Sequence, residues 1–145
     1  MTHVKLNRKA IDEVASVHDL PGQVAAIKKR VGDLSKIHPM FNMVLIATYV
    51  RPNKSAGGII LTPNAVEEDV WQGKVGFVLK CGPDAFKDDP DQGVFFNGQS
   101  ADLDDWVVFK TGDAWQLTVG DWPCRLVRDS GIKMKITDPR IIDKD

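Results

Sequence analysis

The stretch KSAGGIILT (residues 54–62) places two adjacent glycines directly before three large aliphatic side chains. Gly57 and Gly58 accept backbone dihedral angles that other residues avoid, and many of the residues around them are polar or charged. Ile59, Ile60 and Leu61 could therefore form a short buried strand. Alternatively, they form the aliphatic tip of an exposed loop that binds a groove on another protein. The residues alone leave both interpretations open.

The sequence on either side of this stretch predicts short β-strands. Before it, MVLIATYV (43–50) is rich in strand-forming residues and is followed by the turn signal Arg-Pro-Asn. After it, short apolar segments alternate with Gly, Asp and Pro, at the close spacing that is typical of a small barrel or sandwich. We predict further strands over residues 73–82, 105–110, 114–120, 123–129 and 131–137.

The first part of the chain has a different pattern. Aliphatic residues at three- and four-residue steps predict helix over residues 5–37, interrupted at DLPG (19–22). Asp19 is expected to cap the second helix, with Pro21 near its first turn. Residues 1–42 carry seven basic and four acidic side chains (+3), whereas residues 43–145 carry twelve and sixteen (−4). We therefore predict an N-terminal helical arm (1–42) followed by an all-β domain (43–145).

Composition argues against several classes of partner. The chain is 145 residues long with a formal net charge of −1, so no global basic field would attract nucleic acid or an anionic membrane. It has no run of about 18 apolar residues that could span a bilayer, and its first residues carry charges where a signal peptide has an apolar core. We expect a cytoplasmic location. Core or subunit-interface packing, rather than base stacking, is favoured for the four tryptophans, which lie among aspartates: Trp71, Trp106, Trp115 and Trp122.

No motif indicates catalysis or metal binding. The segment DDPDQG (88–93) resembles a calcium loop, but the required register would place Pro90 or Gly93 at ligand positions. Cys81 and Cys124 are too far apart for a CxxC site and have no histidine nearby in sequence, so we predict two reduced thiols. We predict no catalytic residue, no metal site and no cofactor. The histidines match no compact metal-ligand spacing: His3, His18 and His38.

The stretch 54–62 resembles the mobile-loop signature of the GroES co-chaperonin family, with its small-residue lead-in, glycine pair and aliphatic triplet. The resemblance continues on both sides of the motif. MVLIATYV is similar to the family's first barrel strand, at a matching distance before Gly57. WQGKVGFVLKCGP (71–83) resembles the strand and turn after the loop. DLDDWVVF (102–109) is similar to a later strand, with two aspartates in place of a Gly-Asp pair, and ITDPRIID (136–143) resembles the C-terminal strand region.

The resemblance covers about residues 43–143 and implies a GroES-like small irregular β-barrel with two protruding loops. Residues 52–71 would be the mobile loop, and its aliphatic triplet would bind between helices of a chaperonin's apical domain, so that the protein caps the folding cavity. Residues 83–104 would form a roof-like loop. The barrels would assemble into a seven-membered homo-oligomeric ring, with terminal strands pairing between neighbours. The resemblance therefore implies a partner-binding site at Gly57, Gly58, Ile59, Ile60 and Leu61.

Two features depart from the family pattern. The helical arm has no counterpart in the ordinary family member, and Phe95 and Phe96 lie where an acidic, solvent-facing roof is expected, which suggests a covered surface. These features support a second hypothesis, in which the barrel is a structural subunit such as a decoration or cement protein of a phage capsid. Its partners would then be neighbouring capsid proteins and its location the virion. A fold does not determine a function, so both hypotheses stay open.

Overall fold

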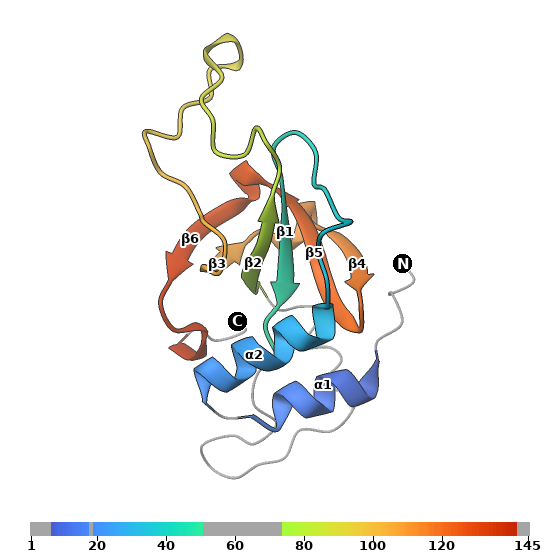
Figure 1. Cartoon of the computed structure of the whole chain (residues 1–145). Helices are drawn as coiled ribbons and strands as arrows, with labels where there is room; N and C mark the ends of the chain where they lie inside the picture. The colour runs from blue at the N-terminus through green and yellow to red at the C-terminus, as the bar shows by residue number, and fades with distance from the viewer. Residues whose placement is uncertain (1–6, 18, 51–73, 142–145) are drawn as a thin grey trace.

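Strand β1 (Met43–Thr48) lies inside a six-stranded antiparallel sheet in the computed structural model of the chain, which describes residues 7–17, 19–50 and 74–141. The other strands are β2 (Val75–Cys81), β3 (Trp106–Phe109), β4 (Trp115–Val119), β5 (Trp122–Arg128) and β6 (Ile132–Ile136). Their order across the curved sheet is β4-β5-β1-β2-β3-β6 (Figure 1). Every predicted strand is present, so the prediction of a small β-barrel is confirmed.

The sheet is buried on both faces around β1. Leu45 and Ala47 pack in one apolar cluster with Phe77 and Trp122, whereas Val44 and Ile46 belong to a second cluster on the other face. This division follows from the period of two in a strand, where successive side chains point to opposite faces. A strand that is buried on both sides has a nearly continuous apolar sequence, which explains the run MVLIA.

Two helices precede the sheet: α1 (Arg8–Ala15) and α2 (Leu20–Val31). Asp19 caps α2 as predicted, because its side chain accepts a hydrogen bond from the Gly22 N–H at 2.8 Å. The prediction that helix continues to residue 37 is wrong. The chain leaves the helix at Gly32, whose φ of +78° lies in the left-handed region.

The helices cover the end of the barrel that lies opposite the long loop between β2 and β3 (Figure 1). Ile11, Ile27 and Val31 belong to the same buried cluster as Leu45 and Trp122. The backbone of α2 comes so close to the turn after β4 that a Cβ atom at Gly120 would overlap the carbonyl oxygens of α2. The helices and the barrel therefore share one core, and the division into two domains at residue 42 stays a prediction.

The basic cluster at the end of α2 forms ion pairs within the chain. Lys28 pairs with Asp104 at 3.1 Å and Lys29 with Glu13 at 3.5 Å. Arg30 pairs with both Glu13 and Asp121. The hydrogen bond from Arg30 lowers the pKa of the Glu13 carboxyl. Most of these side chains are partly exposed, so each pair adds little stability on its own. They join α1, α2 and the barrel at the solvent-facing edge of the core.

Two of the four tryptophans are core residues. Trp122 is fully buried, and its indole N–H donates to the Thr48 carbonyl at 2.9 Å. Trp106 is also buried and packs against Tyr49 and Phe77 at ring-centroid distances of 5.4 and 4.9 Å. Trp115 is 70% exposed at the start of an edge strand. Core packing thus holds for two of the tryptophans, while Trp71 lies outside the described residues.

Candidate functional site

The predicted partner-binding residues, Gly57 to Leu61, lie outside the described residues, but both ends of the segment that carries them are described. The described chain stops at Val50, just after β1, and resumes at Lys74, just before β2. The Tyr49 N–H donates to the Val75 carbonyl at 3.0 Å, and Phe109 N–H donates to the Lys74 carbonyl at 2.9 Å. The segment 51–73 therefore begins and ends on neighbouring antiparallel strands.

This base is tightly packed. Tyr49, Val50 and Val75 are all buried, and the Tyr49 ring meets Trp106 edge-on, with an interplanar angle of 83°. At Gly76 the strands come so close that a Cβ atom would overlap the Ile46 side chain. Buried aromatic contacts and paired backbone groups fix the positions of both ends. The barrel thus provides a rigid attachment for the segment that carries the aliphatic motif.

The two adjacent aromatic residues of the roof-like loop, Phe95 and Phe96, have different surroundings. The Phe96 ring contacts Phe86 edge-on at 5.8 Å, and its backbone N–H donates to Asp88 at 2.7 Å. Phe95, by contrast, is 60% exposed. A short bridge between Asp89 and Val94 closes the tip of the loop. Phe96 therefore packs against the loop itself, whereas Phe95 is exposed at the surface. That a partner covers this surface stays a prediction.

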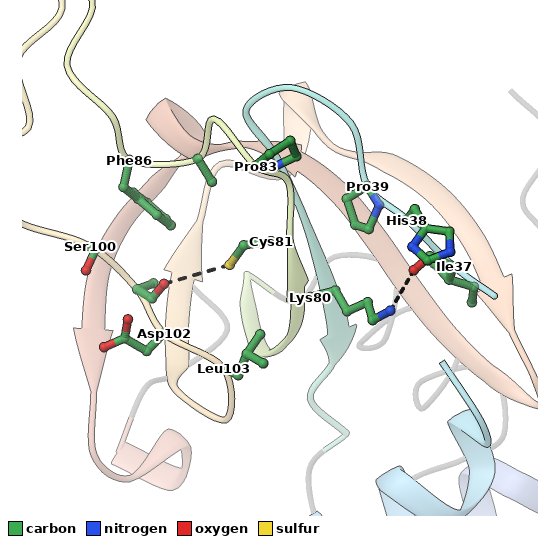
Figure 2. Close-up of a pocket in the computed structure, with 12 residues that line it drawn as sticks. Ile37, His38, Pro39, Lys80, Cys81, Pro83, Phe86, Ser100, Asp102 and Leu103 are labelled. Carbon is green, nitrogen blue, oxygen red and sulfur yellow. Dashed lines mark hydrogen bonds between the residues drawn. The ribbon is translucent and has the colours of Figure 1, made fainter. Parts of the chain in front are cut away.

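A cavity of about 720 Å³ lies between the root of this loop and the segment that follows α2 (Figure 2). Lys80 lies at one wall, and its ammonium donates to the carbonyl oxygens of Leu34 and Ile37 at 2.7 and 2.8 Å. His38 is exposed on the same side. Because two carbonyl groups hold the Lys80 ammonium, we infer that this lysine fixes the path of residues 34–37. Sequence reasoning missed this role.

The two cysteines differ in environment. Cys81 lines the cavity, and its thiol lies 3.9 Å from the Ala101 carbonyl oxygen, to which it can donate. Burial, together with the carboxylates of Asp102 and Asp105, raises the pKa of the Cys81 thiol. Cys124 is fully buried in the core, and burial raises the pKa of its thiol to about 12. Both are free thiols, as predicted.

We expect Cys124 to resist thiol reagents in the folded protein. The thiolate is the reactive form, and a pKa near 12 leaves about one thiolate in 10,000 at pH 8. Cys81 is half-buried, so it should react first, and faster as the pH rises toward its raised pKa. Mass spectrometry after timed labelling with a maleimide, with and without urea, would measure both rates. Equal labelling of the two cysteines without urea would contradict this prediction.

The described part of the chain contains no group of three or more His, Cys, Asp or Glu side chains that could hold a metal ion. No helix among residues 7–17, 19–50 and 74–141 is long and apolar enough to cross a bilayer.

A comparison with models of protein families finds one that matches residues 36–136, and its description is chaperonin 10 kDa subunit. The matched range begins after α2 and ends at the last residue of β6. It includes all six strands and the segment 51–73. A comparison with curated proteins finds no match.

Proposed function

The chain belongs to the chaperonin 10 kDa subunit family, and we propose that the aliphatic motif at residues 57–61 is its chaperonin-binding site. The family is one of non-enzymatic co-chaperones, and it implies a chaperonin as the protein partner. In this proposal the protein caps the folding cavity of a chaperonin ring in the cytoplasm. The family match over residues 36–136 is the observation that carries the proposal, because the matched range includes the motif.

The fixed base of the segment supports this role. Both of its ends join the paired strands β1 and β2. A partner bound at the motif would therefore be tethered directly to the folded barrel. A loop that becomes ordered on binding loses conformational entropy, and each contact is therefore weak and reversible. Several copies on one ring would restore the affinity by raising the effective concentration.

The edge strands support the further proposal of a homo-oligomeric ring. Strand β6 pairs with β3 on one side, and no strand lies along its other side within the described residues. An unpaired strand edge presents backbone donors and acceptors to another chain. In the ring that we propose, this edge pairs with a neighbouring subunit. The roof-like loop would extend over the cavity, on the side opposite the helices (Figure 1).

We expect native mass spectrometry at micromolar concentration to show a closed oligomer of identical subunits. Phe109 and Val107 direct their backbone groups toward β2, so Lys135, the register partner of Val107, directs its N–H to the free edge of β6. Lys135→Pro would remove that donor while leaving the pairing of Met134 with Val108 in place, and the oligomer should become smaller. A spectrum that contains only monomers or dimers of the wild-type protein would contradict the ring.

The direct test of the function uses a double-ring chaperonin. The wild-type protein should co-elute with it in size-exclusion chromatography when ATP or ADP is present and should elute alone without nucleotide. Failure to co-elute under any nucleotide condition would contradict the proposal and favour the second hypothesis, in which the barrel is a structural subunit such as a capsid decoration or cement protein.

A further inference from the structure

A polar side chain lies inside the interface between α2 and the rest of the core. Gln23, Ile27 and Val31 are four residues apart along α2 and are all buried. The Gln23 side chain is fully buried, and neither atom of its amide group has a hydrogen-bond partner in the described part of the protein. A buried amide without a partner destabilises the packed state relative to an apolar side chain of similar shape. The Gln23 amide therefore weakens the packing of α2 against the core.

Among the described residues, the polar links between α2 and the rest of the barrel are few and lie near solvent. The Asp121 N–H, in the turn after β4, donates to the Arg30 carbonyl at 2.9 Å. The ion pairs from Lys28 to Asp104 and from Arg30 to Asp121 join partly exposed side chains, and salt screens such pairs. The helices are held mainly by apolar side chains, whereas the strands are also held by continuous backbone pairing.

The chain after α2 has the form of a hinge followed by an anchor. Gly32 ends the helix with φ +78°, and no atom lies within 4 Å of the place where its Cβ would be. Just beyond it, Lys80 holds the carbonyl oxygens of Leu34 and Ile37. Rotation at Gly32 would therefore move the helices while the following residues stay attached to β2.

We propose that α1 and α2 open from the barrel as one unit about Gly32 while the sheet stays folded, and that Gln23 sets how often they open. The helices move together because Glu13 on α1 pairs with Lys29 and Arg30 on α2. Opening exposes apolar side chains of the shared core at the barrel end that the helices cover. The opening does not rest on the proposed chaperonin binding.

Hydrogen exchange followed by mass spectrometry on the full-length protein, without chaperonin, tests the opening. Peptides from α1 and α2 should exchange faster than peptides from β1 and β5, because local opening requires less free energy than global unfolding. Gln23→Leu removes the unpaired amide from the closed state and should slow exchange in the helices about tenfold. The strands should slow by a similar factor, because global unfolding exposes the same side chain. The matched control is Gln92→Leu, which changes an exposed glutamine in the roof-like loop and should alter neither rate.

A second variant separates local opening from global unfolding. Val127→Ala removes apolar contacts from the cluster on the other face of the sheet, which includes no described residue of α1 or α2. It should speed up exchange in the strands only, because these contacts persist when the helices open. Equal exchange rates for helices and strands in the wild type would overturn the proposal. It would also be overturned if Gln23→Leu left the helical rate unchanged, or if Val127→Ala accelerated the helices as much as the strands. Because no chaperonin is present, these results do not depend on the proposed binding function.

Discussion

Replacing Ile60 with aspartate should abolish nucleotide-dependent co-elution with a chaperonin. A carboxylate that replaces an aliphatic side chain in an apolar groove must lose its hydration without gaining a partner, and this costs several kcal/mol. A loss of about 3 kcal/mol at each loop reduces the affinity of that loop more than 100-fold. The loss is compounded across a ring, because multivalent binding requires that several loops be engaged together.

The matched control for this variant is Asn64→Asp, which adds the same charge in the same segment but outside the motif. It should co-elute with the chaperonin almost as well as the wild type. Both variants should keep the wild-type circular dichroism spectrum and the wild-type oligomer size, which would show that any loss of co-elution comes from the binding site and not from the fold. Normal co-elution of Ile60→Asp would show that residues 57–61 are not the binding site, even if the wild type binds.

Replacing Trp122 with alanine should cause the largest loss of stability that the structure predicts. The side chain is fully buried in the cluster that joins the helices to the barrel. Removing a buried aromatic ring of this kind lowers the free energy of unfolding by about 3–5 kcal/mol. The change also leaves the Thr48 carbonyl without its indole donor. Against a typical total of about 5–15 kcal/mol, such a loss should lower the melting temperature by roughly 10 °C.

The sequence supplies a matched control for this variant. Trp115 is 70% exposed, so Trp115→Ala should change the free energy of unfolding by less than about 1 kcal/mol. Urea denaturation followed by circular dichroism would measure both values. Equal losses for the two variants would show that Trp122 does not have the structural role described above.

The strands could be predicted from the sequence because their apolar runs are short and are separated by turn residues. The alternation between the two clusters around β1 follows directly from its side-chain order. The end of α2 could not be predicted from spacing alone. Leu34 and Ile37 continue the helical period beyond Gly32 because they pack against the same cluster, although they are no longer helical. The apolar spacing of Leu34 and Ile37 thus reflects their burial, whereas Gly32, with its positive φ, ends the helix.

The candidate site was predictable only in part. The motif at residues 57–61 could be proposed as a binding site only through a family resemblance, since glycine and aliphatic residues alone allow a buried strand as well as a loop. The role of Lys80 has no signal in the sequence, because its partners are backbone carbonyls more than 40 positions away. Gln23 falls on the stripe of Ile27 and Val31, so its position was predictable, but its lack of a partner required the three-dimensional structure.

The hydrogen bond between Tyr49 and Val75 has an evolutionary consequence. Only main-chain atoms form it, so it does not depend on which side chains occupy the 23 positions between its two ends that stand outside the described structure. Under the proposed function, substitutions in that interval would change which chaperonin is bound while this hydrogen bond is kept. Selection for a new partner would then act there almost independently of selection for stability.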